Sequence, residues 1–541
     1  MNSLGVNKTI MDPLVALETS RRRTFAIISH PDAGKTTLTE KLLLYGGALG
    51  LAGSVTANKR QRDTASDWME LEKKRGISIS STVLQFDYAG YRLNLLDTPG
   101  HKDFSEDTYR VLMAVDAVIM VIDGGKGIES QTRKLFEICR KRGIPIFTFI
   151  NKMDRPSMPP LELMDQLEKV LNLHAYPVNW PLGNGPYFKG VYDRLAHEVH
   201  MFERVPGGAY RAPVSVHDLS DPVVKETLEP QTYKDVTEEL GLLEGAQGDF
   251  DLEQVLAGKQ TPVFFGSAGN NFGVELLLKG FLEYSTPPTP RRSLKGLIPI
   301  ETPAFSAFVF KVQTNMNPMH RDKVVFVRVC SGKFMRNITV KHVRTGEDIK
   351  LSDSHNIFGR DREIVNEAYP GDIVGFVTKT DLRVGDTISE DASIVYGEIP
   401  KFAPEVFAFM ENEVTSGYKA FRKGIGFLLS ENIVQSFALI EPRNSMPLLG
   451  AVGPLQFEVM QYRLKEEYGA DSRLNSMPWR ILRWVESPIP EEDLKKTLPN
   501  GGGLAMDDQE RYVLLFPNDW SLKYYKELNP TIVLVDSPAI K

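Results

Sequence analysis

The chain has 541 residues, 42% of them hydrophobic and 25% charged, so it is long enough for three or four domains and too apolar to be a disordered protein. Its net charge of -6 excludes a surface coated with basic residues for nucleic acid, and any contact with RNA must come from local patches. Its two cysteines, far apart in apolar segments, and its lack of 18 consecutive apolar residues predict neither a disulfide framework nor a membrane-spanning helix.

The first twenty residues contain no apolar run of the kind found in signal peptides. We therefore expect a soluble, cytoplasmic protein without a membrane or DNA partner, and we expect it to be a monomer.

Short apolar runs alternate with helical patterns in the first half of the chain. Five of these runs are predicted strands: 24–29, 93–97, 117–123, 146–151 and 262–267. Each is apolar at consecutive positions, as strands of a parallel sheet covered on both faces by helices are. Each also ends in a polar cluster, where open α/β sheets place their ligands. We predict a doubly wound, mostly parallel α/β domain over residues 1–290, with an insertion at about 155–260.

Two further domains are expected. A proline-rich linker at 285–303 leads into short strands separated by glycine-containing turns, which is typical of a small antiparallel β-barrel at 300–400. Mixed strand and helix patterns then predict an α+β domain at 401–541. The predicted fold class is thus multidomain α/β.

A candidate phosphate loop lies between the first predicted strand and a predicted helix. It consists of Ser29, His30, Pro31, Asp32, Ala33, Gly34, Lys35, Thr36 and Thr37. Its backbone N–H groups would cradle the α- and β-phosphates, Lys35 would neutralise β- and γ-phosphate oxygens, and the Thr36 hydroxyl would bind Mg²⁺. Ser29 stands where the usual pattern has glycine, and a plain strand-to-helix turn of small residues is the alternative.

The segment Asp97, Thr98, Pro99, Gly100 follows the second of these strands. Asp97 can hold Mg²⁺ through a water molecule, and the Gly100 N–H can meet a γ-phosphate. Ser78, in the segment 75–79, is predicted to complete the magnesium shell when the γ-phosphate is present. The alternative is that 77–82 simply begins the next strand, and both can hold.

The segment Asn151, Lys152, Met153, Asp154 predicts guanine specificity. The Asp154 carboxylate can accept hydrogen bonds from N1–H and the 2-amino group of guanine, whereas adenine has no donor at either position. Asn151 would tie this loop to the phosphate loop, and the Lys152 stem would lie on the base. Ser267 and Ala268 would present a backbone N–H to the guanine O6. The predicted ligands are GTP or GDP with Mg²⁺.

These segments, with His101 directly after Gly100, resemble those of the translation-factor GTPases. Residues 66–78, the barrel segment 319–329 and the chain length resemble, more narrowly, the class II release factors of bacteria, and the resemblance spans about 23–483. It implies a P-loop GTPase domain, a ribosome-dependent GTPase activity in translation termination, and a role in dissociating the codon-reading class I release factor after peptide release. The implied partners are the bacterial ribosome, through rRNA and ribosomal proteins, and functionally the class I factor.

The resemblance also implies a catalytic role for His101. In such GTPases a histidine here takes the place of the water-orienting glutamine of small GTPases, and Pro31 and Ile77 match the apolar pair that keeps it away from the water until the ribosome is bound. Basic residues of the barrel at 320, 321, 323, 341, 342 and 344 could touch ribosomal RNA or be solvated strand-edge charges.

Three alternatives remain. An elongation factor G-like GTPase is disfavoured, because the residues after 401 leave no room for the two further domains that such a factor carries. A metabolic GTPase that drives a partner enzyme would not respond to ribosomes. A ribosome-binding regulator would use GTP only to hold a shape, without turnover.

Overall fold

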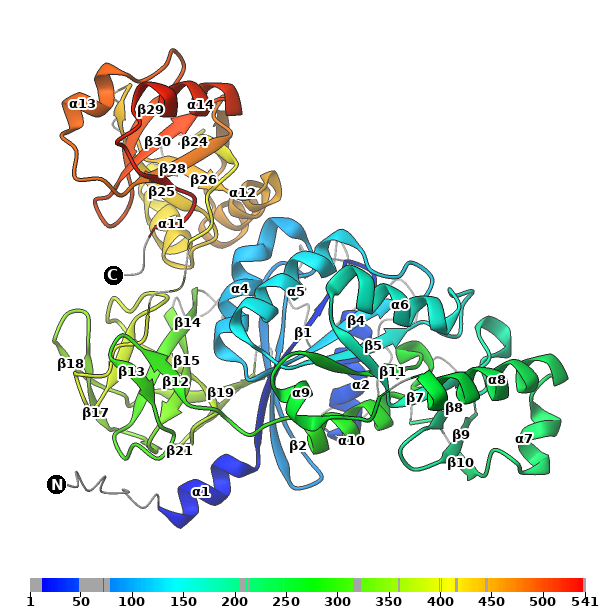
Figure 1. Cartoon of the computed structure of the whole chain (residues 1–541). Helices are drawn as coiled ribbons and strands as arrows, with labels where there is room; N and C mark the ends of the chain where they lie inside the picture. The colour runs from blue at the N-terminus through cyan, green and yellow to red at the C-terminus, as the bar shows by residue number, and fades with distance from the viewer. Residues whose placement is uncertain are drawn as a thin grey trace, which may run out of the picture.

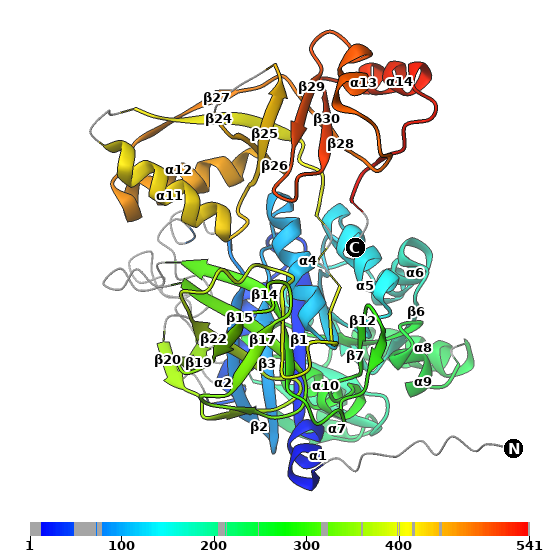
Figure 2. The same cartoon turned by 90° about the vertical axis from the view of Figure 1, so that its left-hand side faces the viewer.

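The structure, a computed structural model, consists of three domains that follow one another along the chain. It describes residues 12–47, 72, 78–203, 211–212, 214–246, 248–314, 323–358, 361–397, 399, 401–413, 417–442 and 446–538. Figures 1 and 2 show the C-terminal domain lying over the other two, which sit side by side.

The N-terminal domain is a seven-stranded sheet with the strand order β2-β3-β1-β4-β5-β11-β6. Only the edge strand β2 is antiparallel to its neighbour. The strands are β1 (Arg22–Ser29), β2 (Thr82–Tyr88), β3 (Tyr91–Asp97), β4 (Ala117–Asp123), β5 (Ile146–Asn151), β6 (His174–Pro177) and β11 (Gln260–Phe265). The helices are α1 (Pro13–Ser20), α2 (Lys35–Tyr45), α4 (Ser105–Ala114), α5 (Ser130–Arg142), α6 (Pro160–Leu171), α9 (Leu252–Leu256) and α10 (Val274–Tyr284).

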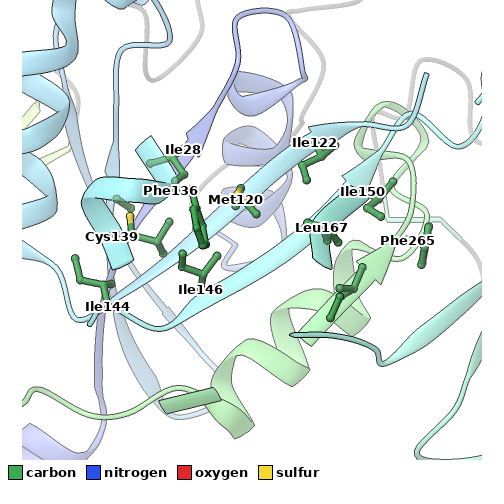
Figure 3. Packing of buried hydrophobic residues seen from close by; sticks show 14 of the residues in the cluster. Ile28, Met120, Ile122, Phe136, Cys139, Ile144, Ile146, Ile150, Leu167 and Phe265 are labelled. Atoms are coloured by element: carbon green, nitrogen blue, oxygen red, sulfur yellow. The ribbon is translucent and has the colours of Figure 1, made fainter. Parts of the chain in front are cut away.

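Alternate side chains of the central strands fill two separate cores. In β4, Met120 and Ile122 pack with α5 and α6 on one face, where Phe136, Cys139 and Leu167 complete the cluster drawn in Figure 3. The intervening residues of β4 pack on the other face with α2 and α10. Because both faces are buried, the strands are apolar throughout, and this is why they could be located from the sequence.

The insertion is smaller than the predicted 155–260. Strand β6 belongs to the main sheet, because it pairs in parallel with β11 from Gln260↔His174 onward. Helix α6 packs on this sheet. The inserted part is a four-stranded antiparallel sheet followed by two helices. These elements are β7 (Asn179–Leu182), β8 (Gly190–Asp193), β9 (Glu198–Phe202), β10 (Val214–His217), α7 (Pro222–Thr227) and α8 (Pro230–Ala246).

The central domain is a curled antiparallel sheet with the strand order β18-β17-β23-β14-β15-β22-β19-β20. Its strands are β14 (Ser306–Thr314), β15 (Lys323–Ser331), β17 (Thr339–His342), β18 (Asp348–Lys350), β19 (Ser354–Phe358), β20 (Asp361–Ile364), β22 (Ile373–Val377) and β23 (Thr387–Ser389), with β16 (Phe334–Met335) and β21 (Glu367–Ala368) forming a separate pair. The linker before it contains a hairpin, β12 (Arg291–Ser293) and β13 (Gly296–Ile298), that the sequence pattern did not indicate.

Two buried ion pairs join the central domain to the sheet of the N-terminal domain. Arg328 contacts Asp116, with both side chains 1% exposed, and Arg22 contacts Asp372 at 2.8 Å. The Gly371 carbonyl accepts hydrogen bonds from Arg328 at 2.8 Å and from the Thr24 hydroxyl at 2.6 Å. Since breaking a buried ion pair leaves an uncompensated charge, these contacts hold the two domains in one arrangement.

The C-terminal domain has an eight-stranded sheet in the order β27-β24-β26-β25-β29-β30-β28-β31. Its elements are β24 (Val406–Asn412), α11 (Tyr418–Ser430), β25 (Gln435–Glu441), β26 (Leu448–Ala451), α12 (Pro454–Tyr468), β27 (Ser472–Ser476), β28 (Ile481–Val485), α13 (Glu491–Lys496), β29 (Gly503–Met506), β30 (Tyr512–Phe516), α14 (Asp519–Leu528) and β31 (Leu534–Val535). Helices α11 and α12 pack on one half of the sheet and α13 and α14 on the other. This is the α+β pattern expected after residue 401.

Among the residues that the structure describes, no helix is long and apolar enough to cross a membrane.

Candidate nucleotide-binding site

The phosphate loop joins β1 to α2 at the carboxyl edge of the sheet. It turns through Asp32 and Gly34, whose φ angles are 66° and 101°. A β-carbon on Gly34 would lie 2.2 Å from Nδ2 of Asn151, so only glycine fits there. Lys35 begins α2, and Thr36 and Thr37 follow in its first turn, where helix N–H groups lack partners within the helix. The predicted loop thus has the local geometry of an anion-binding helix start.

Lys35 and Asp97 meet at this edge, where the neighbouring strands β1 and β3 end. The Lys35 Nζ lies 2.6 Å from Asp97 Oδ1, and both side chains are almost fully buried. The register of the parallel strands brings them together, because Asp97 at the end of β3 pairs with Ile27 of β1. The neighbouring Thr98 hydroxyl donates to the Ile27 carbonyl at 2.7 Å. Carboxylate and hydroxyl oxygens are the ligands that Mg²⁺ prefers, so Asp97 and Thr36 fit such an ion.

Ser78 lies in an irregular segment that precedes β2, which begins only at Thr82. The strand alternative for 77–82 therefore holds only for its last residue. Residues 75–77 lie outside the described residues, and with them the predicted pairing of Ile77 with Pro31. The next residues are anchored, since the N–H groups of Ile79 and Ser80 donate to Glu72 at 2.9 and 3.1 Å.

Lys311 of the central domain holds the same segment from the other side. Its buried amine donates to the Ser80 hydroxyl at 2.8 Å and to the Ser81 carbonyl. Burial lowers the pKa of Lys311, because nearby acidic groups, first among them Asp107, offset only part of the lost hydration. Lys311 is the one charged residue of strand β14, but its target could not be recognised from the sequence.

Asn151 links the two loops that the sequence assigned to phosphate and to guanine. Its Nδ2 donates to the Ala33 carbonyl at 2.8 Å, which is the predicted tie to the phosphate loop. Its Oδ1 accepts from the Ala268 N–H, also at 2.8 Å. The Ser267 N–H donates to the Phe272 carbonyl. The prediction was that one of these backbone N–H groups meets the guanine O6. Both are engaged within the protein, and the bond from Ala268 holds Asn151 in place.

Lys152 follows Asn151 in the left-handed backbone region, with a φ of 67°. Its Nζ donates to the Asp32 carbonyl at 2.5 Å and contacts Asp123 Oδ2 at 2.7 Å. Burial would raise the pKa of Asp123, but the hydrogen bonds from Lys152 and the Gly125 N–H outweigh it, and the pKa lies below its ordinary value. Sequence reasoning missed Asp123, although it is a polar residue at the end of a predicted strand. Met153 is buried, and Asp154 follows it at a half-buried position.

His101 caps the short 3₁₀ helix η1 (Lys102–Phe104) after Pro99 and Gly100. Its Nδ1 accepts from the Asp103 N–H at 3.3 Å and lies 3.4 Å from Asp103 Oδ1. The imidazole is 34% exposed, so its outer edge faces solvent. Gly100 lies against the phosphate loop, because a β-carbon there would be 3.6 Å from Cα of Pro31. The histidine is thus carried by a segment that touches the phosphate loop.

The barrel's basic residues are largely paired with acids of the same domain. Lys341 contacts Asp348 at 2.8 Å, and both His342 and Arg344 contact Asp386. His342 is 1% exposed and cannot reach an RNA. Lys323 donates to the Leu382 carbonyl at 2.8 Å, whereas residues 320 and 321 lie outside the described residues. These pairings favour a structural role for the cluster.

Three family models match consecutive parts of the chain. The Elongation factor Tu GTP binding domain matches residues 20–287, the Elongation factor G domain 2 matches 304–391, and the Class II release factor RF3, C-terminal domain matches 396–526.

Curated relatives match nearly end to end. Peptide chain release factor 3 of Gloeobacter violaceus is 52% identical over 96% of this chain and 98% of the relative. The protein of the same name from Cyanothece sp. is 50% identical over 97% of this chain and 95% of the relative. A crystal structure of a Thermus thermophilus protein covers 85% of this chain and 69% of its own with a TM-score of 0.68, and at 22% identity it shows the fold alone.

Proposed function

Since this chain belongs to the peptide chain release factor 3 family, it is a translational GTPase of termination, and we propose that it speeds departure of the codon-reading class I release factor from the ribosome after peptide release. The proposal rests on the 50–52% identity to release factors over nearly the whole chain, combined with His101 in the segment that follows β3. Its site of action is then the cytoplasm, and it acts there as a monomer without a DNA or membrane partner.

The nucleotide would lie along the carboxyl edge of the N-terminal sheet. Residues 29–37 would hold its phosphates, with the Lys35 amine turning from Asp97 toward the β- and γ-oxygens. A Mg²⁺ ion bound by Thr36 and Ser78, and by Asp97 through water, would neutralise phosphate charge. The Gly100 N–H would meet the γ-phosphate. GTP binding would therefore have to break the ion pair between Lys35 and Asp97, so that Lys35 can contact the phosphates.

Guanine reading would rest on Asp154. Its carboxylate would accept from N1–H and the 2-amino group, and the Lys152 stem would cover the base. Ser267 and Ala268 would act on the base mainly by fixing Asn151, since their N–H groups are already used. Asn151 would in turn keep the phosphate and guanine loops at a constant separation.

His101 would orient the attacking water. Off the ribosome, its Nδ1 is occupied by the Asp103 N–H, so intrinsic turnover should be slow, on the order of 10⁻⁴ to 10⁻² s⁻¹, as in other GTPases that await an activator. His101→Ala should keep GTP binding and lose ribosome-stimulated phosphate release by at least about 100-fold, the effect of losing one acid–base or orienting group. A matched His174→Ala variant, altered on strand β6, should behave like the parent chain.

The assay is phosphate release with and without ribosomes in the post-release state, paired with departure of a labelled class I release factor. A metabolic GTPase would show no stimulation by ribosomes, and a regulator would bind them without phosphate release. Near-normal stimulated turnover of the His101 variant would remove the proposed role of this histidine. Stimulated turnover without faster departure of the class I factor would count against the termination step itself.

A further inference from the structure

The C-terminal domain reaches into the segment that carries His101. The N–H of Leu455, the second residue of α12, donates to Asp103 Oδ2 at 3.0 Å. Pro454 occupies the first position and has no N–H, so Leu455 offers the first free donor of this helix. The Asp103 carboxylate is 3% exposed and lies at the N-terminal, positive end of the helix dipole.

The fit at this contact is tight. A β-carbon on Gly453 would lie 2.1 Å from the Asp103 Cγ and 2.3 Å from each of its carboxylate oxygens, so any side chain there would push the carboxylate away. Beside it, Ile79 and Phe104 of the N-terminal domain form a buried apolar cluster with Leu455 and Val459 of α12. The cluster therefore joins two segments of the N-terminal domain, the one before β2 that contains Ser78 and the one after β3 that contains His101, to one helix of the C-terminal domain. We call these two segments the switch segments.

Asp103 also touches the histidine. Its N–H and Oδ1 lie 3.3 and 3.4 Å from the His101 Nδ1, while its Oδ2 faces α12. We propose that α12 of the C-terminal domain sets the conformation of His101 through Asp103, which acts as a positioning residue and not as a catalytic one. The inference rests on the proposed role of His101. In this arrangement the ring is folded back over η1, and a movement of the C-terminal domain would release it.

Gly453→Ala tests this inference without changing the N-terminal domain. The added methyl group should displace the Asp103 carboxylate and with it η1, whose Asp103 N–H holds the imidazole. GTP hydrolysis in the absence of ribosomes should then rise about fivefold or more, the lower end of ordinary coupling between sites. The affinity for a fluorescent GDP analogue should stay within about twofold, because the phosphate and guanine loops are untouched. Gly426→Ala is the matched control, since its β-carbon on α11 would meet nothing within 4 Å.

Two further variants separate the explanations. In the double variant His101→Ala, Gly453→Ala the rise should disappear, because it acts through the imidazole. Asp103→Ala keeps the backbone N–H that contacts His101 but removes the carboxylate that ties η1 to α12. It should therefore also raise intrinsic hydrolysis by letting η1 move, and it serves if Gly453→Ala does not fold. Thermal unfolding of each variant reports whether the fold is kept.

The outcomes distinguish the inference from the proposed function. Unchanged intrinsic turnover in folded Gly453→Ala and Asp103→Ala variants would overturn the inference, even if His101→Ala still abolishes ribosome-stimulated hydrolysis. A rise that persists in the double variant would also overturn it, since the effect would then bypass the histidine. If His101→Ala has no effect on stimulated hydrolysis, the proposed function of His101 fails independently of these results.

Discussion

Gly34→Ala is the sharpest test of the phosphate loop. Alanine would have to adopt a φ near 101°, and its methyl group would lie 2.2 Å from the Asn151 Nδ2. The backbone penalty is about 1–2 kcal/mol. Asn151 would also lose its hydrogen bond to the Ala33 carbonyl, and a buried polar group left without a partner costs about 1–3 kcal/mol.

The free protein can relax the loop, so most of this penalty should appear when nucleotide binding requires the original conformation. A total of about 2–5 kcal/mol corresponds to a Kd for GDP raised roughly 30-fold to more than 1000-fold. The measurement is an equilibrium titration with a fluorescent GDP analogue, accompanied by thermal unfolding of the protein without nucleotide.

Gly47→Ala is the matched control for the backbone term alone. Gly47 has a φ of 70°, but its β-carbon would meet nothing within 4 Å. It should lower the stability of the fold slightly and leave the Kd unchanged. If Gly34→Ala bound GDP within about threefold of the parent chain, the contact between the phosphate loop and Asn151 would not be needed for binding, and this account of the loop would be refuted.

Two other predictions concern base selection and burial. Asp154→Asn replaces a carboxylate with two acceptor oxygens by an amide with one acceptor and one donor, which matches the N1–H and the 2-oxo group of xanthine. In competition titrations the affinity for GDP should fall about 100-fold and the affinity for the xanthine nucleotide should rise. An unchanged preference for guanine would exclude Asp154 as the residue that recognises the base. Burial raises the pKa of the Cys139 thiol to about 12 and the pKa of the Cys330 thiol above its ordinary value. Both thiols should therefore be protonated at pH 8, and a thiol reagent should label them only after unfolding. Rapid labelling of the folded chain would contradict their burial.

The sequence was sufficient to locate an element where the residues of that element alone determine its structure. Strands β4 and β5 begin and end at the predicted residues, because a strand buried on both faces is apolar along its whole length. Strand β1 begins two residues earlier than predicted, since Arg22 is neutralised by Asp372 and Arg23 lies over the ring of Tyr91. The hairpin in the linker also depends on a distant partner, as Arg291 contacts Asp116 at 2.9 Å.

The candidate site also has a part that could be recognised from the sequence and a part that could not. The phosphate loop, the Asp97 segment and the guanine-reading segment are each contiguous in sequence, and the parallel sheet places each at its carboxyl edge, so their residue types and order could be recognised from the sequence alone. The hydrogen bonds of the Ser267 and Ala268 N–H groups within the protein could not be recognised from the sequence, because backbone N–H groups carry no residue-specific signal.

What only the tertiary structure decided is how the switch segments are held. Lys311 on Ser80 and Ser81, and Leu455 on Asp103, join residues that are hundreds of positions apart in the chain. Hydrophobic periodicity reports which face of an element is buried, and not which distant element covers it. The sequence by itself therefore predicted the residues of a guanine nucleotide site and a histidine beside it, while the packing of three domains determined what that histidine contacts.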